Sequence, residues 1–127
     1  MFDHLGFITA DAARALVFYE AALAPLGLSI VQRHPDGAFI VAGQGEQFLY
    51  VGPDAPEFWR DGHAPARSPI HLCFTAPSAA AVDAFHDAAL TAGGTDNGRP
   101  GERDPGYYAA YVLDPDGNNI EAAHRAA

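Results

Sequence analysis

The 127-residue chain contains an internal repeat, and this repeat restricts the possible folds more than any other feature. When the segment from residue 4 to residue 27 is compared with the segment 67 positions later, ten of 24 positions are identical without a gap. The pattern His-Leu-x-Phe that begins at His4 returns at His71, and Phe18 returns as Phe85. We therefore expect two copies of one structural unit.

Each copy shows the same order of expected elements. Alternating apolar residues predict strands over residues 2–9 and 70–76, and a helical period follows each of them, with Asp11 and Ser78 as N-caps. Three further strands are expected after each helix, at residues 28–34, 38–42 and 47–51, and at residues 95–99, 107–113 and 119–123. The sequence thus predicts an α+β fold of two tandem βαβββ modules.

The modules are expected to form a single domain over residues 1–127, because a chain of this length is too short for two independent cores. Module one is placed at 1–58 and module two at 69–127. The linker, at about 53–69, contains four prolines. In the helices, Phe18 and Phe85 belong to equivalent apolar stripes and are expected to be buried.

Alternation along the strands predicts which side chains share a face. One apolar set is expected beneath the helices, namely Leu5, Phe7, Leu72, Phe74, Ile120 and Ala122. His4, His71 and Glu121 then lie on the opposite face. Two imidazoles and one carboxylate suit Zn²⁺, Mn²⁺, Fe²⁺ or Ni²⁺, so these three residues are candidate metal ligands. The alternative for each one alone is an ordinary hydrogen-bonded strand residue.

Tyr111 is expected on the same face as the candidate ligands. Side chains alternate along the strand, so Tyr111 points the same way as Tyr107 and opposite to Ala110 and Val112. Its phenol either donates a hydrogen bond to a bound oxygen or lines the pocket, so Tyr111 and Glu121 are the candidate catalytic residues. The other histidines belong to no such group and are expected at the surface, namely His34, His63, His86 and His124.

These features resemble the vicinal-oxygen-chelate superfamily, which contains glyoxalases, extradiol dioxygenases and bleomycin-binding proteins, over essentially the whole chain. The resemblance implies a curved, mixed sheet that forms a cup, with the helices on its outer face and a divalent metal at its base. It also implies that His4 and His71 are the first-strand ligands and that Glu121 is the last-strand carboxylate of module two.

Two features bear on the type of activity that the resemblance implies. Glyoxalases have a fourth ligand in the last strand of the first module, but residues 48–50 offer none, and only Glu46 and Gln47 are near. Three ligands instead resemble the facial triad of extradiol dioxygenases. The run YVLDPDGNNIE that begins at Tyr111 follows the spacing of their signature, with Arg103 about where that signature has a histidine.

Composition excludes several classes of partner. Seven basic against sixteen acidic residues give a net charge of −9, which repels nucleic acids. No apolar run approaches the length of a membrane span, and no leader pattern precedes the first strand. Cys73 is the single cysteine and cannot form an internal disulfide. We expect a cytoplasmic protein that binds a small molecule and neither nucleic acid nor membranes.

Two functions from different classes follow. The first is a divalent-metal-dependent enzyme of the lyase, isomerase or dioxygenase type, whose metal acts as a Lewis acid on an oxygen-chelating substrate. The alternative is a metal-free small-molecule binding protein of the bleomycin-resistance kind, and the negative charge favours its cationic ligand. In either case we expect a homodimer, because four-stranded modules leave exposed edges.

Overall fold

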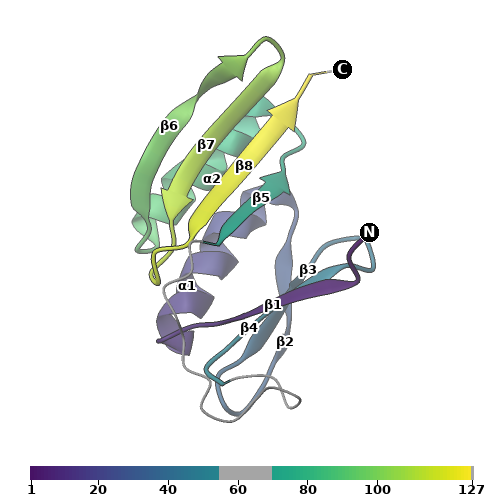
Figure 1. Ribbon diagram of the computed structural model, residues 1–127, viewed down its shortest axis with the longest axis vertical. Helices are drawn as coiled ribbons and strands as arrows, with labels where there is room; N and C mark the ends of the chain where they lie inside the picture. The colour runs from purple at the N-terminus through teal and green to yellow at the C-terminus, as the bar shows by residue number, and fades with distance from the viewer. Residues whose placement is uncertain (55–69, 127) are drawn as a thin grey trace.

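The computed structural model describes residues 1–54 and 70–126, so most of the expected linker lies outside the described residues. Module one consists of β1 (His4–Ile8), α1 (Ala12–Leu23), the 3₁₀ turn η1 (Ala24–Leu26), β2 (Ser29–Arg33), β3 (Phe39–Ala42) and β4 (Phe48–Gly52). Module two consists of β5 (His71–Thr75), α2 (Ala79–Thr91), β6 (Thr95–Asp104), β7 (Tyr107–Leu113) and β8 (Asn119–Arg125) (Figure 1). The predicted α+β fold of two βαβββ modules is confirmed. None of the described helices is long and apolar enough to cross a membrane.

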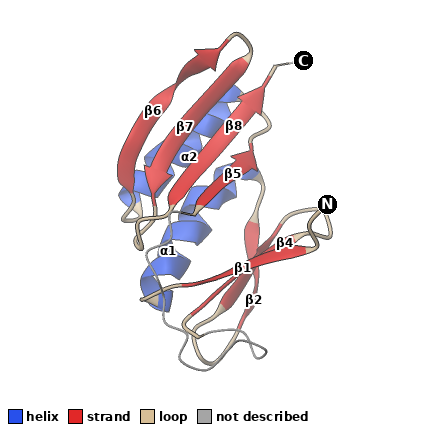
Figure 2. Ribbon diagram, viewed as in Figure 1, coloured by secondary structure: helices blue, strands red, loops and turns tan. Residues whose placement is uncertain are grey.

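Each module forms a four-stranded mixed sheet of its own. The strand orders are β1-β4-β3-β2 and β5-β8-β7-β6, so the first strand of each module is an edge strand. β1 runs parallel to β4, and β5 runs parallel to β8, while the remaining pairs are antiparallel. Figure 2 shows the second sheet with α2 behind it, which leaves the other face of that sheet free of helices.

The helices begin where the capping residues predict. The Asp11 side chain accepts a hydrogen bond from the Arg14 amide at 3.1 Å, and the Ser78 hydroxyl accepts one from the Ala81 amide at 3.1 Å. These bonds satisfy backbone donors that a helix N-terminus leaves free. Gly27 ends the first helical segment in the left-handed conformation, with φ of 82°, which a residue with a side chain adopts at a cost.

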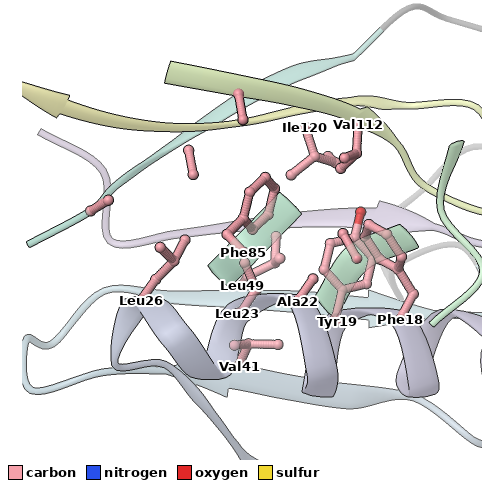
Figure 3. Packing of buried hydrophobic residues seen from close by; sticks show 14 of the residues in the cluster. Phe18, Tyr19, Ala22, Leu23, Leu26, Val41, Leu49, Phe85, Val112 and Ile120 are labelled. Atoms are coloured by element: carbon pink, nitrogen blue, oxygen red, sulfur yellow. The ribbon is translucent and has the colours of Figure 1, made fainter. Parts of the chain in front are cut away.

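A single apolar core joins the two modules, as Figure 3 shows for residues from both helices and both sheets. The predicted helix stripes are fully buried at Ala15, Phe18, Ala22, Val82, Phe85 and Ala89. Phe7, Leu72 and Phe74 pack against this core. Leu5 does not follow the prediction, because it is 41% exposed and lines a pocket at the edge strand β1.

Two details of module two differ from expectation. β6 extends five residues beyond the predicted end at residue 99, and it does so through three register shifts against β7. The expectation of a surface position is wrong for His86, which is buried on α2. Its Nε2 lies 2.9 Å from Asp96 Oδ1, and this hydrogen bond lowers the pKa of Asp96. His86 corresponds in the repeat to Tyr19, which is also buried, so the comparison of the two helices indicates burial of His86.

Candidate functional site

The strand register of module two places five side chains of the candidate site on the sheet face that points away from α2. Cys73 pairs with Glu121 across β5 and β8, and Tyr111 pairs with Glu121 across β7 and β8. His71 lies two residues before Cys73, and Tyr107 four residues before Tyr111, so both share this face. The neighbours of Glu121 in β8 are fully buried on the helix side.

The Glu121 carboxylate is enclosed although it belongs to the open face, with an exposed fraction of 3%. Its Oε2 lies 3.0 Å from His71 Nε2, and its Oε1 accepts a hydrogen bond from the Tyr107 hydroxyl. This hydrogen bond, followed by burial, raises the pKa of Tyr107. Glu121 is therefore fixed in position by side chains from two other strands.

The two nitrogens of His71 both face acceptors. Nδ1 lies 3.2 Å from the carbonyl oxygen of Asn119, and Nε2 faces the Glu121 carboxylate. A neutral imidazole carries one N–H and satisfies only one of these acceptors. Both are satisfied by an imidazolium, or by a cation placed between Nε2 and Oε2.

A divalent ion fits this pair of ligand atoms. Two atoms that each lie about 2.0–2.2 Å from one ion are about 3.3–3.6 Å apart in tetrahedral geometry and about 2.8–3.1 Å apart at the right angles of octahedral geometry. His71 Nε2 and Glu121 Oε2 have a separation of 3.0 Å. The bond from His71 Nδ1 to a backbone carbonyl is the support that metal-binding histidines normally have. Two of the three expected ligands are thus brought together.

His4 lies apart from this pair. Its ring stacks on Phe48 in module one, with ring centres 4.6 Å apart, and its Nδ1 is 2.5 Å from Asp3 Oδ1. About half of the His4 side chain is exposed. Within residues 1–54 and 70–126, no three His, Cys, Asp or Glu side chains group around a common metal position. One chain therefore does not assemble the three-ligand set in its described part.

The equivalent face of module one has no counterpart of the Glu121 carboxylate among its paired strand residues. The β1/β4 register pairs Gly6 with Tyr50, just as β5/β8 pairs Cys73 with Glu121. Tyr50 therefore occupies the position of the carboxylate, which agrees with the absence of a fourth ligand from residues 48–50. Ile40, which pairs with Tyr50, is an apolar residue on this face, and Gln32, which pairs with Ile40, is a polar one.

A pocket of about 360 Å³ lies between the edge strands β1 and β5. His4 and Phe48 line it from module one, and Cys73 lines it from module two. Cys73 is the register partner of Glu121, so the pocket reaches the residue next to Glu121, although neither His71 nor Glu121 lines it. The His71–Glu121 pair therefore lies near a cavity whose lining is largely apolar.

Residues 1–122 match the sequence model of a family described as the glyoxalase/bleomycin resistance protein/dioxygenase superfamily. The chain belongs to this superfamily. A glyoxalase/bleomycin resistance protein from Albidiferax ferrireducens T118 is 31% identical, with 99% of each chain covered and a TM-score of 0.77. No protein of curated function matches the sequence.

Two more distant structures share the fold of this superfamily member. Lactoylglutathione lyase from Agrobacterium tumefaciens is 22% identical, with 97% of this chain and 92% of that chain covered and a TM-score of 0.68. A glyoxalase-related enzyme from Fulvimarina pelagi is 18% identical, with 97% and 86% covered and a TM-score of 0.73. At these identities the similarity concerns the fold alone.

Three residues next to the candidate site are not among the site residues predicted from the sequence, namely Tyr107, Arg125 and Arg103. Tyr107 binds Glu121, although only Tyr111 was singled out. The guanidinium carbon of Arg125 lies 4.2 Å from the centre of the Tyr107 ring, and that of Arg103 lies 5.3 Å from the centre of the Tyr111 ring. The available signal for Tyr107 is that it points to the same side of its strand as Tyr111, and the signal for Arg103 is its place about where the extradiol signature has a histidine.

The Cys73 thiol reports on the charge of Glu121. Loss of solvation, followed by the Glu121 charge and hydrogen bond, raises the pKa of Cys73 to about 11. We predict that Glu121→Gln increases the rate of Cys73 alkylation by iodoacetamide at pH 8 by about threefold to tenfold, because thiolate formation no longer occurs beside an anion. Glu102→Gln, on exposed β6, serves as the control. An unchanged rate in Glu121→Gln would contradict this assignment of the raised pKa.

Proposed function

We propose that the protein is a divalent-metal-dependent enzyme of the lyase, isomerase or dioxygenase type, acting on a small substrate that chelates through neighbouring oxygens. The observation that carries the proposal is the His71–Glu121 pair, in which two acceptors face one imidazole at hydrogen-bond distance. His71 and Glu121 would hold the ion. When bound, it would supply Lewis-acid chemistry to the substrate oxygens.

The side chains around the pair have separate roles in this proposal. Tyr107 positions Glu121 by donating a hydrogen bond to its Oε1. Tyr111 lies beside His71, with ring centres 6.3 Å apart and the planes inclined by 23°. We assign to Tyr111 the donation of a hydrogen bond to a substrate oxygen, and to Glu121 the acceptance of a proton in addition to its role as a ligand.

The third ligand is proposed to be the partner subunit's His4 in a homodimer. His4 occupies the repeat-equivalent position on module one but does not join His71 and Glu121 within one chain. The edge strand β1 and the residues before it expose apolar side chains, with Phe2 56% and Leu5 41% exposed. Two copies would bring β1 and the residues before it against the polar face of module two.

Metal titration of the purified protein tests the proposal. We expect binding of Zn²⁺, Mn²⁺, Fe²⁺ or Ni²⁺ in calorimetry, weakened at least about 100-fold by His71→Ala or Glu121→Gln, because each removes one ligand. His124→Ala is the matched control, since His124 lies in β8 on the opposite face from Glu121. A protein that ignores all four ions would defeat the proposal.

Mixing two inactive variants tests whether the site is shared between subunits. His4→Ala and His71→Ala would each lose metal binding as homodimers. After co-refolding, a heterodimer has one intact site, so random mixing should restore about a quarter of the wild-type metal capacity. No recovery, with both variants folded and dimeric, would contradict a site shared in this way, and tight metal binding by His4→Ala alone would contradict the role of His4.

A metal-free small-molecule binding protein is the second candidate function, and the enclosure of Glu121 favours it. The carboxylate already accepts a hydrogen bond from Tyr107 and lies 3.0 Å from His71 Nε2, so an N–H at Nε2 would complete its network without a metal. The titration described above separates the two functions. In both, a cytoplasmic location remains our expectation from the sequence.

A further inference from the structure

Two arginines stand over the aromatic rings of the candidate site. Arg125 pairs with Tyr107 in the β7/β8 register, and its guanidinium carbon lies 4.2 Å from the centre of that ring. The guanidinium carbon of Arg103, from β6, lies 5.3 Å from the centre of the Tyr111 ring. Both distances are within the range of cation–π contacts. The two cations therefore share the face that carries Glu121.

Neither guanidinium is neutralised by a carboxylate in the part of the chain that the structure describes. Arg33, by contrast, forms an ion pair with Glu20 at 3.1 Å. Arg103 Nη2 donates to two backbone carbonyls, those of Arg99 and Ala109, which fixes the plane of the group. A guanidinium has five N–H donors, so three of those on Arg103 have no partner among residues 1–54 and 70–126. Both arginines are exposed, and a ligand on this face can reach them.

This arrangement opposes the overall charge of the protein. A net charge of −9 attracts cationic ligands, yet the rim of the candidate site presents two oriented cations without carboxylate partners among the described residues. A planar carboxylate accepts two parallel N–H bonds from a guanidinium, which gives both affinity and orientation. Local charge of this kind decides which small ligand is bound, whereas net charge acts mainly at longer range.

We propose that Arg103 and Arg125 form a carboxylate-recognising rim, and that the ligand of this site is a small organic acid. This inference rests on the proposed function for the position of the chelating oxygens, which would lie at the His71–Glu121 pair. The carboxylate would lie at the opposite end of the molecule, against the two guanidinium groups. Tyr107 and Tyr111 support the arginines from below and fill the space between the two ends.

Three probes of similar size and different charge test the rim, namely 3,4-dihydroxybenzoate, catechol and 3,4-dihydroxybenzylamine. Each is titrated into wild-type protein by calorimetry, both without metal and with Mn²⁺. We expect the anionic probe to bind about tenfold more tightly than neutral catechol, the difference given by one charge-assisted hydrogen bond, and the cationic probe to bind most weakly. Mn²⁺ should strengthen all three by a similar factor, because they share the catechol group.

Substitution then assigns the preference to the two arginines. Arg103→Gln with Arg125→Gln should abolish the tenfold preference, whereas Arg103→Lys with Arg125→Lys should retain only part of it, because lysine lacks the planar fork. Arg33→Gln, in the ion pair of module one, should leave the preference unchanged. The inference is overturned if the double glutamine variant keeps the preference, if catechol or the amine binds best, or if the anionic probe does not bind. If the anion preference persists but Mn²⁺ changes nothing, the proposed metal function fails and the rim stands.

Discussion

Replacing Phe18 or Phe85 with alanine is expected to lower the free energy of unfolding by about 3–5 kcal/mol in each case. The two side chains are fully buried at equivalent positions of α1 and α2, within one core that joins both modules. Phe18 packs edge-on against Tyr19, with ring centres 4.9 Å apart. Its ring also lies so close to Gly94 that a side chain at position 94 would clash with it. Truncation at either position removes apolar burial and leaves a cavity that close-packed neighbours fill only in part.

Denaturant unfolding monitored by circular dichroism measures both changes. The midpoint should fall in each variant while the dependence on denaturant concentration stays near the wild-type value. Val17→Ala is the control, because Val17 lies in α1 but is 58% exposed, and its truncation should change the free energy by less than about 1 kcal/mol. A large effect in one module and none in the other would contradict the equivalence of the two helices in a shared core.

The fold was predictable because its determinants are local and occur twice. Capping by Asp11 and Ser78 and the burial of Phe18 and Phe85 depend on patterns within about 25 residues. The repeat then allowed a clear signal in one half to support a weaker one in the other. The repeat also indicates that His86 is buried, because His86 occupies the position in α2 that Tyr19 occupies in α1, and Tyr19 is buried.

The candidate site was predictable only as far as one sheet extends. Parity placed His71, Tyr111 and Glu121 on one face, and the register of module two brings them together. Parity says nothing about how two sheets face each other, so it did not reveal that His4 would lie apart. Nor does it follow a strand through bulges, so the family signature indicated Arg103 but the alternation of β6 did not predict its contact with the Tyr111 ring.

Replacing Asp114 with alanine is expected to lower the free energy of unfolding by about 3–5 kcal/mol, because several buried donors would lose their acceptor together. Asp114 is 4% exposed, in the turn between β7 and β8. Its Oδ1 accepts the amides of Asp116 and Asn118 at 2.9 and 2.8 Å, and its Oδ2 accepts the Tyr19 hydroxyl at 2.5 Å and the Asn118 side chain at 2.9 Å. Burial, followed by the charge of Asp114, raises the pKa of Tyr19 well above its ordinary value.

Because Tyr19 belongs to α1, this turn of module two is bound to the helix of module one, and a double-mutant cycle can isolate that contact. Tyr19→Phe removes one donor and leaves three, so it should cost about 1–2 kcal/mol, and its effect should shrink when Asp114 is already alanine. Asp87→Ala, on the exposed face of α2, is the control and should change the free energy by no more than about 0.5 kcal/mol. If Asp114→Ala were as mild as this control, the turn would not hold the modules together. If the two substitutions were additive, the stabilisation would come from the turn alone and not from its bond to α1.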